Sequence, residues 1–405
     1  MAKPGPFSIK LPWLLTMTLG LSVPACRDQS RSLPSGEAPD QAGPLATLEL
    51  DAAYPEPFSY LSGVRELPDG RLLAADPMSQ VLLRLDLEAG TADTLGGQGA
   101  GPEEYQGPDH VLPLPGDSSL LVDLGNARLT VLDSKGAFVY GIPMFRARED
   151  GTARTIHPRF SDNAGLLYVP AAYNMEGAPP DSSGISRFQR GENAETVVAW
   201  AWRPEPPPFD PSAKRPMLRP MDDWAAGPDG RVAVVRANGY SVDWYLPDGR
   251  ILRGPPNTVE TFPVHQAEKD AEMDNLASAA LFTSVVVGDG GTQSRQMARG
   301  LPPGAGPGMD EFEWPETLPV FRPMGTLISP RGEAWVQRIM PQTMPPRYDV
   351  FDREGLRLGS VELPPGSKVI SFGARPATQD RLYLTRTDEV GLVWLESYRL
   401  RRDGR

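Results

Sequence analysis

The sequence predicts an all-β protein: a six-bladed β-propeller that is closed by an N-terminal strand and carries one helical insertion between blades four and five. Three features lead to this fold class, namely a repeated turn, a high content of turn-forming residues and a spare strand at the N-terminus. The turns recur about every 47 residues except at insertions, and such a period of strands and turns is typical of propeller blades. They lie at residues 68–71, 115–118, 161–165, 228–231, 330–333 and 377–380.

The composition agrees with many short strands. The chain has 405 residues, of which 45 are Pro and 41 are Gly. This is about a fifth of the chain, against a usual share of about 12% for the two residue types together. Hydrophobic residues make up 40%, which is enough for a sizeable core. Frequent turns combined with a full apolar content favour strands joined by tight turns over long helices.

Each repeat is expected to fold into four antiparallel strands, with its first strand innermost. In blade one the strands are predicted at 64–67, 71–75, 81–86 and 91–95, and in blade two at 109–114, 119–123, 128–132 and 137–141. Blades three to six are predicted at about 157–203, 221–255, 318–363 and 369–400. Aspartates follow the apolar runs at matching positions, and we expect them to cap the turns: Asp76, Asp86, Asp123 and Asp133.

Blade six is one strand short before the chain ends. The segment 46–50 (ATLEL) precedes blade one and has no other partner. Pairing it with blade six would close the ring and cover two sheet edges that an open array would leave unpaired. The propeller is therefore expected to span residues 45–405.

Two segments interrupt the period. Residues 96–108 (GGQGAGPEEYQGP) are rich in glycine but lack a Gly-Lys-Ser/Thr sequence, so they are interpreted as a connection between blades one and two and not as a phosphate loop. The longer insertion covers about 256–317. Within it, 265–281 contains no Gly or Pro and predicts a helix with a partial apolar stripe, whereas 288–308 is expected to be loop. The helix either covers the central channel or packs at its side.

The N-terminus predicts export. Residues 11–25 form an apolar stretch without charge, which suits a signal peptide and is too short to span a bilayer. Cys26 is the single cysteine of the chain and follows short side chains, as in the lipobox of bacterial lipoproteins. We expect residues 1–26 to be a lipoprotein-type signal peptide with lipidation at Cys26, and 27–44 to be a flexible tether. An ordinary secretory peptide with an incidental cysteine is the alternative.

The charge excludes one class of partner. The chain carries a formal net charge of −12, so it has no electrostatic reason to bind nucleic acid. A single cysteine also rules out an internal disulfide.

The expected location is the bacterial cell envelope, either the periplasm or the outer surface. We expect the chain to contact the membrane through its lipid anchor and to be a monomer.

Several phrases resemble those of a known family. They are Gly-x-Gly-Pro-Glu-Glu-Tyr at 99–105, followed by Pro108, and the paired runs LLAAD…VLLRLD at 72–86 and LLVDLGNARLTVLD at 120–133. Over about residues 45–400 the chain resembles six-bladed β-propeller lipoproteins of bacteria related to NHL-repeat propellers. That resemblance implies binding of proteins, peptides or glycans. A related group, the gluconolactonase-like hydrolases, holds a divalent cation in the channel with Glu, Asn and Asp, but no such ligand set aligns onto this chain.

One candidate site follows from the repeat. Counting back seven residues from each turn gives equivalent positions on the inner strands, Gly63, His110, Pro158, Asp223, Gly325 and Phe372. Two of the chain's three histidines then fall at or next to the same position in adjacent blades. With neighbouring carboxylates they would form a channel cluster of metal-ligand or acid–base type: Asp109, His110, His157, Asp222 and Asp223.

Two functions remain open from the sequence. The first is a membrane-anchored extracytoplasmic binding or scaffold module for a protein, peptide or glycan, because no catalytic motif is identified. The second is a divalent-cation-dependent hydrolase or lyase, gluconolactonase-like, with its site in the central channel. The sequence predicts no cofactor. A divalent cation such as calcium would nevertheless suit the acidic members of the cluster.

Overall fold

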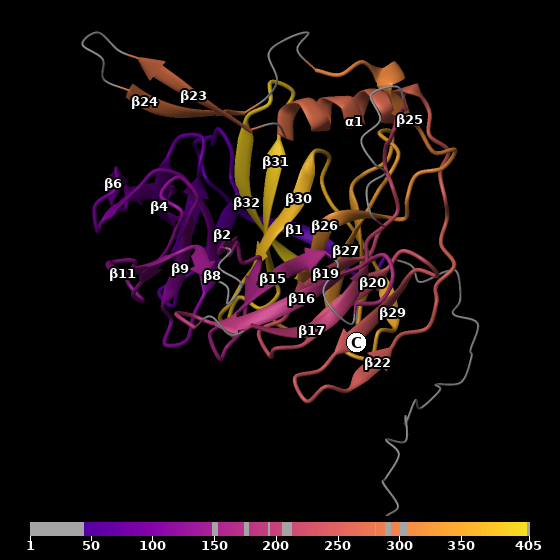
Figure 1. The fold of residues 1–405 in the computed structure, drawn as a ribbon, viewed down its shortest axis with the longest axis horizontal. Helices are drawn as coiled ribbons and strands as arrows, with labels where there is room; N and C mark the ends of the chain where they lie inside the picture. The colour runs from indigo at the N-terminus through magenta and orange to yellow at the C-terminus, as the bar shows by residue number, and fades with distance from the viewer. Residues whose placement is uncertain are drawn as a thin grey trace, which may run out of the picture. The chain divides into compact units, whose positions relative to one another are not determined.

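A computed structural model describes most of the chain after residue 43 (Figure 1). The described residues are 44–147, 153–173, 178–192, 195–204, 213–279, 281–287, 293–299 and 306–402. Contacts divide the chain into the units Met1–Ser35 and Gly36–Arg405, and every described residue belongs to the second. The predicted signal peptide, Cys26 and tether residues 27–43 lie outside the described residues. Among the residues described, no helix is long and apolar enough to cross a membrane.

Six four-stranded antiparallel sheets make up the propeller, as predicted. In sheet order, blade one is β2 (Gly63–Glu66), β3 (Leu72–Asp76), β4 (Val81–Asp86) and β5 (Thr91–Thr94); blade two is β8 (Pro108–Pro113), β9 (Ser119–Asp123), β10 (Arg128–Leu132) and β11 (Phe138–Pro143). Blade three is β14 (Phe160–Ser161), β15 (Leu166–Tyr173), β16 (Ser182–Gln189) and β17 (Glu195–Trp202); blade four is β19 (Asp223–Ala226), β20 (Val232–Arg236), β21 (Ser241–Tyr245) and β22 (Ile251–Arg253). Blade five is β26 (Phe321–Ile328), β27 (Ala334–Arg338), β28 (Arg347–Phe351) and β29 (Arg357–Glu362); blade six is β30 (Ser367–Phe372), β31 (Arg381–Thr387), β32 (Val393–Arg401) and β1 (Thr47–Ala53).

The N-terminal strand closes the ring, which confirms the prediction from the sequence. β1 pairs antiparallel with β32, from Thr47 opposite Arg401 to Ala53 opposite Glu396. The carboxylate of Asp51, at the bulge of this pairing, lies 2.5 Å from the guanidinium of Arg381 and 2.9 Å from that of Arg399. Two ion pairs to blade six therefore add to the backbone pairing of β1. The first and last strands of the ring thus belong to one sheet.

An apolar cluster fills each of the six junctions between neighbouring blades. Each cluster takes buried side chains from both blades, for example Leu73 with Leu121, Leu129 with Leu167, Ile185 with Val234, Trp244 with Val336, Tyr348 with Leu384, and Tyr383 with Leu72. Since a twisted sheet buries its faces only against a neighbour, each blade depends on the two beside it. The last of these clusters joins blade six to blade one and completes the circle.

The inner strands begin at one face of the ring, which we call the start face. Asp109 at the beginning of β8 contacts His157, which lies just before β14. At the opposite ends of the same two strands, the Ser161 hydroxyl donates to the Pro113 carbonyl at 2.5 Å. Gly63 opens β2 so close to β8 that an added Cβ would stand 2.9 Å from the Val111 amide nitrogen. Inner strands of adjacent blades therefore lie alongside one another with starts level.

Aspartates cap the turns as expected. Asp76 Oδ1 accepts hydrogen bonds from the amides of Met78 and Ser79, both at 2.9 Å. Asp133 serves the turn 134–137 in the same way, and Asp123 accepts from the Asn126 amide of its own turn at 3.4 Å. Asp86 accepts from the Ala89 amide at 2.9 Å. These repeated carboxylates are structural.

The glycine-rich connection after blade one forms a short parallel pair, β6 (Gly97–Gln98) with β7 (Glu104–Tyr105). Its amide at Gly101 donates to the Glu104 carboxylate at 2.7 Å, and its carbonyls accept from blade two, including Gly99 from Asn126 at 2.8 Å. These contacts account for the segment as a connection between blades. Further short pairs are β12 (Phe145–Ala147) with β13 (Ala153–Thr155) and β18 (Arg215–Pro216) with β25 (Phe312–Glu313).

The insertion departs from the sequence prediction in two respects. The helix α1 (Gln266–Ala279) is present, but Leu281 begins a strand: β23 (Leu281–Val287) pairs with β24 (Gln293–Arg299), in part of the segment predicted as loop. A 3-10 turn, η1 (Met309–Glu311), follows. The predicted apolar stripe packs only in part: Ala271 and Met273 are half-buried, whereas Leu276 is 38% exposed. Glu268 is the buried residue of the described part of α1, so polar contacts also hold the helix.

The repeat predicts Phe372 as the equivalent of Gly63 and Asp223 on the inner strands, and this prediction is wrong. Phe372 is the last residue of β30, whereas its presumed equivalents Gly63 and Asp223 are the first residues of β2 and β19. The reason is the connection from β30 to β31, which runs from residue 373 to 380 and is longer than the Pro-Asp-Gly turns.

A buried carboxylate holds blade six to blade one next to the closing sheet. The Glu66 side chain is fully buried and accepts hydrogen bonds from the Ala374 amide at 2.6 Å, the Thr378 hydroxyl at 2.7 Å and the Tyr383 hydroxyl at 3.1 Å. Arg375 adds an ion pair at 2.9 Å. Burial alone would raise the pKa of Glu66, but the hydrogen bonds from Thr378 and Arg375 outweigh it and lower that pKa below its ordinary value of 4.5.

We expect Glu66→Gln to lower the free energy of unfolding at neutral pH by about 1–3 kcal/mol, because a buried acceptor loses its charge. A depressed folded-state pKa contributes stability that is present above the unfolded pKa and is lost as the pH falls. Denaturant unfolding between neutral pH and the acid side of 4.5 should therefore show a steeper loss for the wild type than for the variant. The matched control is Glu49→Gln, which removes an exposed Glu–Arg pair between β1 and β32. A Glu66→Gln protein that follows the control at every pH would contradict the prediction.

Candidate metal centre at the start face

The start face carries side chains from the beginnings of the inner strands. Blade two contributes Asp109 and His110 from β8, blade three contributes His157 and Arg159 from the segment leading into β14, and blade four contributes Asp222 and Asp223 at β19. These are the positions that the repeat predicted. Adjacent inner strands lie level, with β8 in contact with β14 and β14 in contact with β19. Of these residues, Asp109, His110 and His157 come together in one group.

Asp109, His110 and His157 form a compact group. One oxygen of Asp109, Oδ2, contacts both imidazoles: Nδ1 of His110 and, at 3.2 Å, Nε2 of His157. The two rings stand edge to face with centroids 5.8 Å apart. One ligand atom from each residue lies within 4.8 Å of the other two. Among the described residues, this is the group of His, Cys, Asp and Glu that has the spacing of a metal site.

The carboxylate at the centre of the group is ionised. Burial by itself would raise the pKa of Asp109. The hydrogen bonds and charge interactions with His110 and His157 have the larger effect and bring that pKa well below its usual range. Its side chain is 11% exposed, whereas those of His110 and His157 are 39% and 47% exposed. The group therefore has a charged, buried base and an outer edge that is open to solvent.

This donor set suits a divalent transition metal better than calcium. Imidazole nitrogen is a preferred ligand for Zn²⁺ and similar ions, whereas Ca²⁺ takes six to eight oxygen ligands. Tetrahedral zinc holds nitrogen and oxygen ligands at about 2.0–2.2 Å, so neighbouring ligands stand about 3.4 Å apart. Small side-chain rotations would bring the three atoms to that spacing. Three protein ligands with a solvent-facing side would leave one coordination position for another molecule.

Asp222 and Asp223 were predicted to belong to the same cluster, but the structure engages them elsewhere. Asp222 accepts hydrogen bonds from the Trp202 amide at 2.9 Å, the Ala237 amide at 2.9 Å and the Arg236 guanidinium at 2.8 Å. Burial lowers the pKa of Arg236, but its hydrogen bonds to Asp222 and Asp243 raise it overall. Asp222 thus anchors blade four to the end of blade three.

Asp223 links the inner strands of three blades. Its Oδ2 accepts a hydrogen bond from the Thr326 amide of β26 at 2.9 Å, and its Oδ1 lies 3.7 Å from the Arg159 guanidinium. Arg159 in turn lies over the ring of Trp224, 4.8 Å from its centroid. Burial lowers the pKa of Arg159 and Asp223 opposes that shift. Trp224 is 5% exposed and belongs to the apolar cluster between blades three and four, so the contact of Arg159 with Trp224 is part of the packing between these blades.

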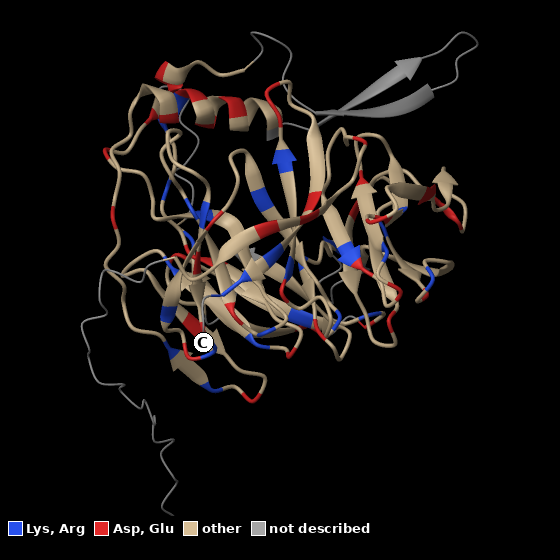
Figure 2. Cartoon of the chain, turned by 180° about the vertical axis from the view of Figure 1, so that it is seen from behind, with Lys and Arg blue, Asp and Glu red and all other residues tan. Residues whose placement is uncertain are grey.

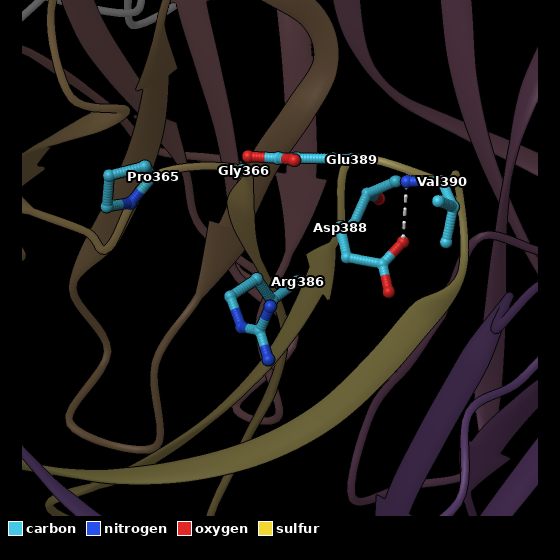
Figure 3. A pocket seen from close by; sticks show the side chains of 7 residues that line it. Pro365, Gly366, Arg386, Asp388, Glu389 and Val390 are labelled. Carbon is cyan, nitrogen blue, oxygen red and sulfur yellow. Dashed lines mark hydrogen bonds between the residues drawn. The ribbon is translucent and has the colours of Figure 1, made fainter.

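Two hollows lie near the loops of the start face. The larger, of about 560 Å³, lies at blade six and is lined by residues such as Pro365, Arg386, Asp388 and Val390 (Figure 3). Its polar side chains are used within the blade: Asp388 accepts from the Val390 amide, drawn in Figure 3, and Arg386 donates to Glu396 at 2.7 Å. The smaller, of about 270 Å³, lies beside α1. Sequence analysis identified neither, since both depend on how loops fold back.

Comparisons with known proteins add little to this picture. No protein-family model and no curated protein sequence matches the chain. Solved structures similar to it include a member of the DUF4221 family from Bacteroides vulgatus (9% identity, 88% of this chain and 99% of that chain, TM-score 0.46). Others are virginiamycin B lyase from Staphylococcus aureus (9%, 87% and 99%, 0.40) and a gluconolactonase from Xanthomonas campestris (15%, 89% and 98%, 0.38). At these identities and scores the likenesses assign no activity.

We expect Zn²⁺ to raise the melting temperature of the metal-stripped ring, because an ion that binds only the folded state stabilises it by about 2.7 kcal/mol at 100 times its dissociation constant. His157→Ala should abolish the shift, and EDTA should reverse it. His265→Ala is the matched control, since His265 is an exposed histidine of the insertion outside the group. The readout is scanning fluorimetry together with metal content after dialysis. Equal zinc content in the wild type and His157→Ala would contradict the site.

Proposed function

We propose that this chain is an exported, lipid-anchored binding module that recognises a protein, peptide or glycan at the start face of its ring. The observation that carries the proposal is the convergence of Asp109, His110 and His157 from two blades into one open group. A divalent transition metal held there would offer its free coordination position to a carboxylate or hydroxyl oxygen of the ligand.

The shape of the ring supports recognition at this face. The inner strands are fixed by the apolar clusters at each junction, so side chains at their starts are held on a rigid frame. A rigid site loses little conformational freedom on binding, which favours affinity. The helix α1 is tied to blade five and leaves the imidazoles of His110 and His157 39% and 47% exposed. A large ligand therefore has direct access to the group.

The binding role is tested by retention of ligands on immobilised protein. Zinc-loaded wild type is expected to retain a class of glycan or of envelope protein that His157→Ala does not, whereas His265→Ala should retain it fully. The reason is that the metal supplies the contact and only the first variant removes a ligand to it. Glycan arrays and detergent extracts of cell envelopes are suitable sources. Equal retention by the wild type and His157→Ala would refute a role of the metal in binding.

A hydrolase or lyase is the second candidate, favoured by the exposure of both imidazoles. A zinc ion with three protein ligands and an open position activates water in many hydrolases. Asp109, buried at the base of the group, would be the anionic ligand of the three, beside the two imidazoles. The zinc-loaded ring should then hydrolyse simple probes such as δ-valerolactone or p-nitrophenyl acetate, and His157→Ala should fall to the rate of buffer. No rate above buffer with Zn²⁺, Mn²⁺ or Ca²⁺ would remove this candidate and leave binding.

The lipid anchor is tested by fatty-acid labelling. In a bacterial host fed an alkyne fatty acid, the wild-type chain should become labelled and Cys26→Ser should not, because Cys26 is the single thiol of the chain. Returning a thiol at another position, with Ser30→Cys in the Cys26→Ser background, should not restore the label. Labelling of this double variant, or no labelling of the wild type, would contradict lipidation at Cys26.

A further inference from the structure

A small pocket lies between α1 and the beginnings of the strands of blade five. Its volume is about 270 Å³, close to the lower end of the range of about 300–1,000 Å³ for small-molecule sites. Glu272 of α1 forms one side of it, and Arg219 and Arg322 form another. Met221, which also lines it, directly precedes the start-face residue Asp222, so the pocket lies next to the start face and is separate from the histidine group.

The charged side chains of the pocket already hold a carboxylate. Arg322 donates to Glu272 through both terminal nitrogens, at 3.1 Å and 3.4 Å, in the forked geometry with which guanidinium binds a carboxylate. The two side chains are 36% and 18% exposed, so the pair is partly shielded from water. Arg219 adds a second guanidinium to the lining.

The remaining lining is apolar. It consists of Pro216, Leu218, Met221, Pro319, Pro323 and Ile339. A compact apolar wall beside a guanidinium pair matches a molecule with one carboxylate and a short hydrocarbon body. The apolar wall would bind the hydrocarbon and Arg322 would fix its orientation. Phosphate and sulfate have no hydrocarbon part, so they would make no contact with the apolar residues of the pocket.

Two of the seven described non-glycine residues with positive φ lie in or next to this pocket. Leu218 has φ +52° and Met324 has φ +63°, a left-handed conformation that is uncommon for residues other than glycine. Met324 is 74% exposed and sits in an irregular stretch of β26, where the pairing slips between Phe321 opposite Arg338 and Thr326 opposite Val336. Strained residues and bulges of this kind collect at ligand sites, because neighbouring structure is used to hold them.

Two carboxylates tie the helix that covers the pocket to blade five. Glu268 caps the first turn by accepting from the His265 amide at 3.0 Å and also accepts from the Gln342 amide of blade five at 3.3 Å. Glu272, one turn further along, makes the contact with Arg322. Figure 2 shows acidic residues at intervals along α1. With Glu268 as the fixed point, the Glu272 side chain can leave Arg322 without exposing an apolar core.

We propose that this pocket is a binding site for a small aliphatic carboxylate and that Glu272 occupies the position of the ligand's carboxylate in its absence. When the ligand binds, its carboxylate replaces that of Glu272 on Arg322, and its hydrocarbon body contacts Leu218, Met221 and Ile339. Glu272 turns to solvent. This site is independent of the histidine group and of any metal bound there.

The test uses butyrate and hexanoate, with butyramide as a neutral analogue of the same shape, and calorimetry in EDTA. Glu272→Gln should bind butyrate about tenfold more tightly than the wild type, because an internal competitor that reduces the binding-competent fraction is gone. Hexanoate should bind more tightly than butyrate, and butyramide should not bind. Glu311→Gln is the matched control: it breaks the Arg215–Glu311 pair of the same insertion, at 2.9 Å and outside the pocket, and should behave as wild type.

Loss of the guanidinium should remove binding. Arg322→Met is expected to eliminate butyrate binding; if that variant does not fold, Arg322→Lys keeps the charge but loses the fork and should bind more weakly than the wild type. His157→Ala should bind butyrate as the wild type does, which separates this site from the metal centre. Butyrate affinity that is unchanged in Glu272→Gln, or butyramide binding equal to butyrate, would overturn the proposal.

Discussion

The antiparallel pairing of β1 with β32 is the constraint on which the rest of the structure depends. It makes blade six a complete sheet, and a complete blade six can cover the open sides of both blade five and blade one. Without it, Tyr383 and Glu66 would face each other across an incomplete junction. In a closed ring every blade packs against a neighbour on both faces, so each apolar cluster is enclosed by two blades. Closure therefore acts on all six junctions at once.

Closure also explains how a site arises from short strands. The inner strands are forced to lie level around the ring, and the residues just before or at their starts then meet even when they are far apart in sequence. His157 and Asp109 are 48 residues apart in the sequence, yet Nε2 of His157 lies 3.2 Å from Oδ2 of Asp109. Asp223 reaches Thr326 across 103 residues by the same geometry. Whether the residues brought together form a candidate ligand site or a structural contact depends on which hydrogen-bonding groups the neighbouring blade places beside them.

The fold and part of the site could be predicted from the sequence, for different physical reasons. Turn chemistry and the repeat are local, so the blades and the convergence of Asp109, His110 and His157 followed from spacing alone. The roles of Asp222 and Asp223 did not, because Arg236 and the Thr326 amide come from parts of the fold that spacing does not locate. In the insertion, β24 reads QSRQMAR, which lacks the alternation of a strand and forms one only against β23. The packing of α1 through Glu268 could not be seen in an apolar pattern.

The position of β1 has a mechanical consequence. It is the outermost strand of its sheet, it is the first strand of the ring along the chain, and its pairing runs from Thr47 to Ala53 against the last strand. Tension applied to the N-terminus first meets the hydrogen bond from the Leu45 amide to the Ser360 carbonyl of blade five, at 2.8 Å, and then passes into this one ladder. If the pull runs along the strand, the hydrogen bonds of the ladder are loaded together in shear; if it runs across the strand, they open one after another from Thr47. In the second case the ion pairs of Asp51 with Arg381 and Arg399, at the bulge partway along the ladder, would be loaded only after the first pairs had separated.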